Sequence, residues 1–73
     1  MIKSFRNISK AAGPLLEVKG VDGARYDELV EVIMSSGEKR RGQVIEIHED
    51  IALIEVFEGT SGIMPKDLPK VVW

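Results

Sequence analysis

The sequence contains no cysteine, a single histidine and only 5% aromatic residues, and each scarcity excludes a class of protein. Without cysteine, the chain has neither disulfides nor thiolate metal sites to stabilise it. No apolar run approaches the roughly 18 residues of a membrane-spanning helix, so we expect no direct membrane contact. The first residues also lack the apolar segment of a signal peptide, which predicts a cytoplasmic protein.

An excess of positive charge is missing as well. Ten lysines and arginines are outnumbered by twelve aspartates and glutamates, which gives a net charge of −2. Dedicated nucleic-acid-binding domains are normally basic, so we expect no nucleic-acid partner. Hydrophobic residues make up 44% of the 73 residues and charged residues 30%, which is a composition typical of folded chains. A chain of this length can bury one hydrophobic core, which predicts a single domain over residues 1–73.

What the chain does contain is a series of short apolar segments, rich in valine, isoleucine and leucine and separated by turn residues. Alternation with period two predicts a β-strand in each segment. It places Val30 and Val32 together on one side of their strand, and it does the same for Ile54 and Val56. We expect strands at residues 4–10, 15–19, 28–35, 39–48, 51–57 and 71–73.

Strict alternation over residues 39–48 puts Ile45 and Ile47 on the opposite side of the strand from Val44 and Glu46. The short turns between successive segments suit antiparallel hairpins. Short strands need a closed sheet to protect their edges from pairing with other chains. The sequence therefore predicts an all-β fold, a small closed six-stranded antiparallel β-barrel with Greek-key-like order.

The residues that could carry chemistry form no recognisable site. A zinc ion needs three or four converging ligands, and His48 has only Glu46 on its side of the strand while Glu49 points away. No serine lies in a Gly-x-Ser-x-Gly motif, and paired carboxylates beside turns are normally exposed. We therefore predict no catalytic, cofactor-binding or metal-binding residues and no enzyme activity.

The glycine-rich loop at 58–62 has some likeness to a phosphate-binding loop. Such loops need Gly-x-x-x-x-Gly-Lys-Ser/Thr spacing and a following helix whose N-terminus faces the anion. Here Gly62 is followed by Ile63, Met64 and Pro65, and a residue before proline is disfavoured in a helix. We therefore interpret the two glycines as positive-φ residues at a corner of the barrel.

One alternative function stays open. Lys39, Arg40 and Arg41 form the densest basic cluster, and basic side chains of this kind bind phosphates. The alternative is therefore a small oligonucleotide-binding-like barrel that contacts nucleic acid through these three residues. Because the aromatic residues lie elsewhere in the sequence, the cluster lacks the stacking platform of single-strand binders. We prefer a charged strand start or a protein-contact surface.

Four segments, taken in order, resemble one family. They are Ala-Gly-Pro-Leu-Leu at 12–16, Tyr-Asp-Glu-Leu-Val-Glu-Val at 26–32, Gly-Glu-Lys-Arg-Arg-Gly-Gln-Val at 37–44 and Val-Phe-Glu-Gly-Thr-Ser-Gly-Ile at 56–63. The series, within residues 2–63, resembles the N-terminal β-barrel domain of the B (non-catalytic) subunit of archaeal and vacuolar-type rotary ATPases. The catalytic A subunit has a similar barrel, but the third and fourth segments are nearer to those of the B type.

The resemblance implies an assembly role. In this family, the N-terminal barrels of three A and three B subunits form a crown that holds the hexameric head together, and the head supports ATP-coupled ion transport. Nucleotide contacts belong to a central domain, so the resemblance implies no catalytic or nucleotide-binding residue in this chain. The implied partners are the barrels of neighbouring A and B subunits. The isolated barrel is expected to be inactive, with a homo-oligomer as an option.

The tail at 64–73 departs from the family pattern. Pro65 and Pro69 are unexpected there, and the glycine that usually follows the last strand is absent. We interpret this departure as a sign of an excised or engineered barrel.

Overall fold

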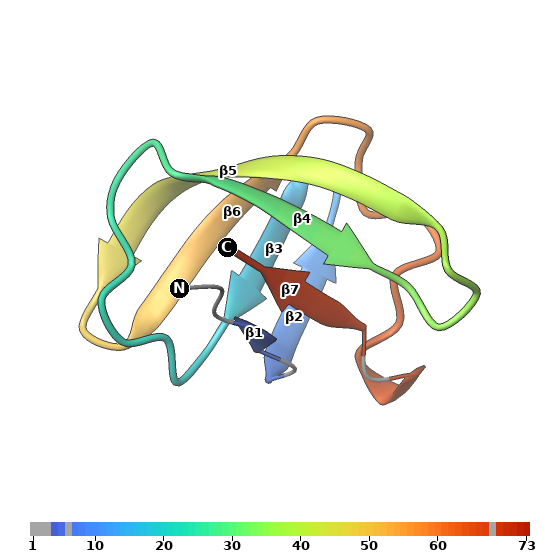
Figure 1. Cartoon of the computed structure of the whole chain (residues 1–73), viewed down its shortest axis with the longest axis horizontal. Coiled ribbons are helices and arrows are strands. Elements are labelled where there is room, and N and C mark those ends of the chain that lie inside the picture. Colours follow the sequence, from blue (N-terminus) through green and yellow to red (C-terminus); the bar gives the residue numbers. More distant parts are fainter. Residues whose placement is uncertain (1–3, 6, 68) are drawn as a thin grey trace.

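The structure, a computed structural model, describes residues 4–5, 7–67 and 69–73, which form one strongly curved antiparallel sheet (Figure 1). A short 3₁₀ helix, η1, precedes the last strand. The elements are β1 (Ser4–Phe5), β2 (Ile8–Ala12), β3 (Leu15–Val18), β4 (Leu29–Ile33), β5 (Lys39–His48), β6 (Ile51–Val56), η1 (Pro65–Asp67) and β7 (Lys70–Val72).

Within the described residues the sheet has seven strands, in the order β1-β7-β4-β5-β6-β3-β2. The strands β4, β5 and β6 are successive antiparallel neighbours, and β7 returns to pair with the outer side of β4. Three consecutive hairpin strands with the fourth beside the first make a Greek key. The all-β class, the antiparallel pairing and the Greek-key order predicted from the sequence are confirmed.

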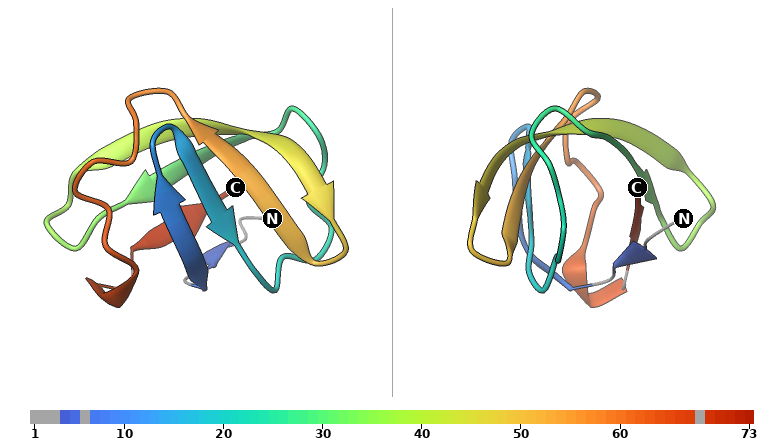
Figure 2. Two further views of the ribbon diagram at one scale, coloured as in Figure 1. Left: turned by 180° about the vertical axis from the view of Figure 1, so that it is seen from behind. Right: turned by 60° about the vertical axis from the view of Figure 1, so that its left-hand side comes forward.

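The two ends of the sheet, β1 and β2, are separated in the chain by residues 6 and 7 alone. In a flat sheet they would lie roughly 29 Å apart, whereas so short a link spans about 11 Å at most. The sheet therefore curls, as Figure 2 shows, into a shape compatible with the predicted closed barrel. The predicted first strand at 4–10 is thus two strands that belong to opposite ends of the sheet, and Arg6 between them lies outside the described residues.

The inward side of the curled sheet carries the hydrophobic core. Leu16, Val32 and Ile54 are fully buried, and each lies where period two predicts an inward side chain. At one end of the core, the Trp73 ring meets the edge of the Phe5 ring with centroids 5.3 Å apart. The buried apolar residues in the described part of the chain are Ile8, Leu16, Val18, Val21, Val30, Val32, Val44, Ala52, Ile54, Val56, Ile63 and Val71.

Strict alternation fails in β5, where a β-bulge shifts the register against β6 between Val44 and Glu46. Val44 is fully buried, and Ile47 packs against the same core. The expectation that Ile47 lies on the side opposite to Val44 is therefore wrong. The reason is the extra residue, Ile45, which stays unpaired and 40% exposed and resets the alternation after it.

The pairing of β5 with β6 requires a glycine at position 42. A Cβ atom added to Gly42 would lie 2.8 Å from both the Glu55 carbonyl oxygen and Ile54 Cγ2. Both distances are shorter than any normal van der Waals contact, so a larger residue would push the two strands apart. Gly42 pairs with Val30 on β4 and with Val56 on β6. Its missing side chain lets β6 lie this close to β5.

Candidate interaction surfaces

The glycine-rich loop at 58–62 is hydrogen-bonded to the barrel. The backbone N–H and the hydroxyl of Thr60 both donate to the Gly13 carbonyl oxygen, at 3.0 and 2.7 Å, and Thr60 is buried. Gly59 and Gly62 have φ values of 81° and 85°, a region that favours glycine. The interpretation of this loop as a positive-φ corner of the barrel is confirmed.

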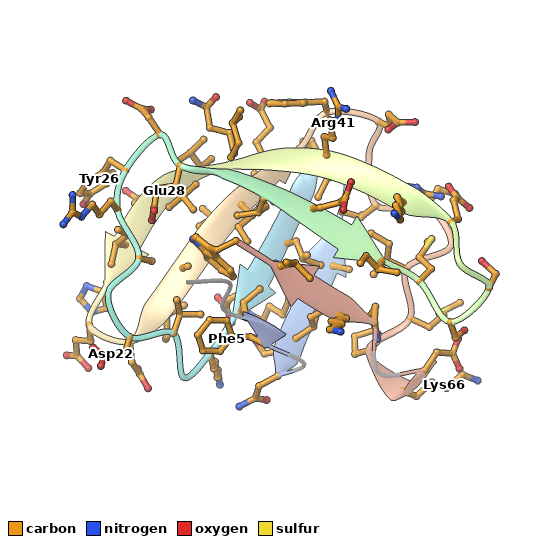
Figure 3. All side chains as sticks on the ribbon, viewed as in Figure 1. Phe5, Asp22, Tyr26, Glu28, Arg41 and Lys66 are labelled. Atoms are coloured by element: carbon orange, nitrogen blue, oxygen red, sulfur yellow. The ribbon has the colours of Figure 1, made fainter. Side chains whose placement is uncertain are left out.

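The three basic residues at the start of β5 do not share one surface. Arg40 is only 12% exposed through its side chain, and its Nε donates to Glu38 Oε2 at 2.8 Å. Its Nη1 donates to the Gly59 carbonyl oxygen at 2.9 Å. Lys39 and Arg41 are exposed on the other side of the strand, and Figure 3 shows Arg41 projecting outward from the barrel.

This arrangement weakens the nucleic-acid alternative. Consecutive residues of a strand point to opposite sides, so the cluster of Lys39, Arg40 and Arg41 exists in the sequence alone. The Arg40 guanidinium is occupied in fastening the loop at 58–62 to β5, which leaves only Lys39 and Arg41 of this cluster for a phosphate backbone. We therefore look for function on other parts of the surface.

The residues that the sequence analysis considered and rejected as metal ligands lie at the far end of β5. His48 Nε2 and Glu49 Oε1 are 3.9 Å apart, and both side chains are more than four-fifths exposed. The expectation that Glu49 points away from His48 is therefore wrong, because the strand ends at His48 and Glu49 has a left-handed φ of 57°. Glu46 is exposed as well, on the same side of the strand as His48. Over the described ranges, no three histidine, aspartate or glutamate side chains come together in a way that could hold a metal ion. The arrangement is that of solvated residues at a strand end.

The outward side of β4, β5 and β7 offers a different kind of surface, a shallow apolar groove. Leu29 and Phe57 stand at its walls, 70% and 55% exposed, and Arg41 lies among them. The groove holds about 440 Å³ and is lined by Leu29, Val30, Glu31, Arg41, Phe57, Val72 and Trp73. Large apolar side chains exposed next to each other on a small protein mark a contact surface.

Sequence alternation places Leu29 and Phe57 opposite the core, but it does not bring them together. Their placement in one groove depends on the registers that pair β5 with β4 and with β6. The hydrogen bond from the Phe57 N–H to the Arg41 carbonyl oxygen, 3.0 Å long, holds Phe57 beside β5, where it forms part of the groove lining. The only sign of this groove in the sequence is that a leucine and a phenylalanine fall among polar residues on the outward side.

Comparison with known proteins places this barrel in a family. Residues 8–68 match the model of the ATP synthase alpha/beta family, beta-barrel domain. The chain belongs to this ATP synthase family. Over 64 residues it is 53% identical to the B subunit of the A-type ATP synthase from Aeropyrum pernix, an alignment that covers 88% of the chain and 14% of that protein. The resemblance to the N-terminal barrel of a B subunit is confirmed.

The match extends the ATP synthase barrel beyond the segments that carried the resemblance. It includes Pro65, which begins η1, although this residue was unexpected from the family pattern. The strand that follows, β7, is part of the sheet through its pairing with β1 and β4. In the part of this ATP synthase barrel that the structure describes, no helix has the length and apolar character needed to cross a membrane.

Proposed function

We propose that the chain is the non-catalytic assembly barrel of the B subunit of an A-type or vacuolar-type ATP synthase. It packs beside the barrels of neighbouring A and B subunits in the crown of the head, at the cytoplasmic side of the membrane. The head as a whole couples ATP chemistry to ion transport. The chain spans 14% of the length of its A-type relative, and nucleotide chemistry belongs to the remaining part of the subunit.

The observation that carries this proposal is the apolar groove on the outward side of a barrel of this family. Leu29, at 70% exposed, is among the most exposed large apolar side chains of the described residues, and Phe57 lines the same groove. An isolated domain gains nothing from such exposure, whereas a domain in a ring of barrels buries it against a neighbour.

The experiment uses a complete B subunit in which this chain replaces the natural barrel, mixed with its A subunit. Introducing Leu29→Asp places a charge in the groove, and we expect the yield of assembled hexamer to fall about tenfold or more, since burying an unpaired charge is costly. Native mass spectrometry measures the hexamer fraction. Met64→Asp is the matched control, because Met64 is also exposed, at 51%, and lies outside the groove.

Two results would contradict the proposal. One is full assembly of hexamers that carry Leu29→Asp, which would remove the groove from the interface. The other is ATP hydrolysis by the 73-residue chain alone, which would assign chemistry to the barrel itself.

A further inference from the structure

The outward side of the barrel carries two surfaces of opposite charge. The first, the positive face, lies on β7, β4 and the first half of β5, and its charged residues are Lys39, Arg41, Lys70 and one glutamate, Glu31. The second, the negative face, lies on the second half of β5, β6, β3 and β2, and its charged residues are Glu17, Glu46, Glu55 and one lysine, Lys10.

The strand registers set these residues in rows. On the positive face, Glu31 lies between Arg41 on β5 and Val72 on β7, and Ile33 lies between Lys39 and Lys70. On the negative face, Leu53 lies between Glu46 on β5 and Glu17 on β3, and Glu55 pairs with Leu15. Each face therefore combines exposed or half-buried apolar side chains with charges of mainly one sign.

The two faces adjoin at Gln43, which pairs with Leu29 and with Glu55, and from there the sheet curves them to opposite sides of the molecule. In the right-hand view of Figure 2, β5 arches over the top of the molecule, with β6 and β3 on one side and β4 and β7 on the other. The bulge at Ile45 divides the two parts of β5 that contribute to the faces. A barrel of this shape can contact one neighbour through each face at the same time.

We propose that neighbouring barrels join through a heterologous contact in which the positive face of one meets the negative face of the next. This inference rests on the proposed function and names the surfaces that perform it. The occupant of the apolar groove is the negative face of a homologous barrel and, for the isolated chain, that of a second copy. Leu15 and Leu53 supply the apolar surface opposite Leu29 and Phe57, and the complementary charges set the orientation.

Charge also decides between the two kinds of symmetry. A two-fold contact brings the same face of both partners together, which would oppose Lys39 and Arg41 to their own copies. Like charges placed opposite each other are unfavourable at an interface. A heterologous contact avoids this conflict, and such contacts generate rings when the rotation closes.

The test inverts each face with exposed residues that take no part in the core. One variant carries Lys39→Glu and Arg41→Glu, and the other carries Glu46→Lys and Glu55→Lys. Sedimentation velocity and amide NMR shifts at millimolar concentration measure the self-association of the wild-type chain. We expect shifts on both faces, weaker association as salt rises from about 50 to 500 mM, and about tenfold or more weaker association for each variant alone.

An equimolar mixture of the two variants is the decisive sample, because the inverted faces complement each other again. We expect association between the variants to return to about the wild-type level. Lys66→Glu, an exposed change on η1, is the control and should leave association unchanged. The proposal is overturned if the wild-type chain stays monomeric, if only one face shifts, or if the mixture associates no better than each variant alone.

Failure of the proposed pairing of faces can be distinguished from failure of the proposed assembly function. Hexamers that lose yield with Leu29→Asp but are indifferent to both charge inversions would preserve the assembly role and reject the pairing of these two faces. Hexamers indifferent to all of these changes would reject both.

Discussion

The two halves of β5 differ in almost every respect, although they form one continuous strand. The first half, residues 39–43, pairs with β4 along its full length and with β6 only at Gly42 and Gln43, follows strict alternation and carries three basic residues. The second half, residues 44–48, pairs with β6, contains the bulge at Ile45 and carries Glu46 and His48. One strand therefore contributes to two sides of the barrel with opposite charge.

The difference shows what the bulge does. If Ile45 were paired with β6 like its neighbours, strict alternation would send Ile47 outward and Glu46 toward the core. The bulge resets the side chains, so that the acidic residue faces solvent and the isoleucine packs against the core. A local irregularity thus lets one strand bend around the barrel and keep a consistent inside and outside along its full length.

The largest loss of stability is expected from a charge at buried Val44, and a much smaller loss from a charge at its exposed neighbour Ile45. Val44→Asp buries an unpaired charge at a position with 0% exposure, and we expect a loss of at least about 3 kcal/mol, enough to unfold much of a small domain. Ile45→Asp, one residue away at the bulge and 40% exposed, should cost less than about 1 kcal/mol. Urea denaturation followed by circular dichroism measures both, and similar losses would show that the bulge is misplaced.

An intermediate effect is expected at the junction of the two halves. Gly42→Ala adds a Cβ atom 2.8 Å from the backbone of β6, and overpacking of this kind costs about 1–3 kcal/mol. Gly13→Asn is a useful control, because asparagine tolerates the left-handed φ of 58° at that turn. Thermal unfolding should give a clearly lower Tm for Gly42→Ala than for the control. Equal values would indicate that β5 and β6 can separate freely here.

The sequence alone correctly predicted which side chains face the core in the strands that alternate regularly. Val32 and Ile54 alternate with neighbours that are more exposed, and period two identifies their inward side from the local pattern alone. The bulge at Ile45 and the division of residues 4–10 into two strands escaped prediction, because both depend on which distant strand pairs with which. Local pattern carries no information about that choice.

The candidate surfaces were hidden for the same reason. Leu29 and Phe57 are 28 positions apart in the sequence, and only the sheet order brings them to one groove. The Arg40 guanidinium finds its partner on the loop at Gly59, a contact that composition cannot reveal. The order of the sequence motifs therefore identified the family. The pairing of strands distant in the sequence determines which side chains form a contact surface.

The smallest losses of stability are expected from alanine substitutions in the first half of β5. They should still differ clearly between the neighbours Arg40 and Arg41. Arg40→Ala removes hydrogen bonds to Glu38 and to the Gly59 carbonyl oxygen from a side chain that is 12% exposed. We expect a loss of about 1–2 kcal/mol, whereas Arg41→Ala, on the exposed side, should change stability by less than about 0.5 kcal/mol. Guanidinium denaturation measures both losses.

The same two variants separate a fastening role from a contact role. Amide exchange of the loop at 58–62 should quicken in Arg40→Ala and stay unchanged in Arg41→Ala, because of the two arginine side chains Arg40 is the one that donates a hydrogen bond to that loop. Self-association should respond in the opposite way, since Arg41 lies in the groove and Arg40 does not. If Arg40→Ala weakened association while leaving the loop protected, the inward and outward roles assigned to these neighbours would have to be exchanged.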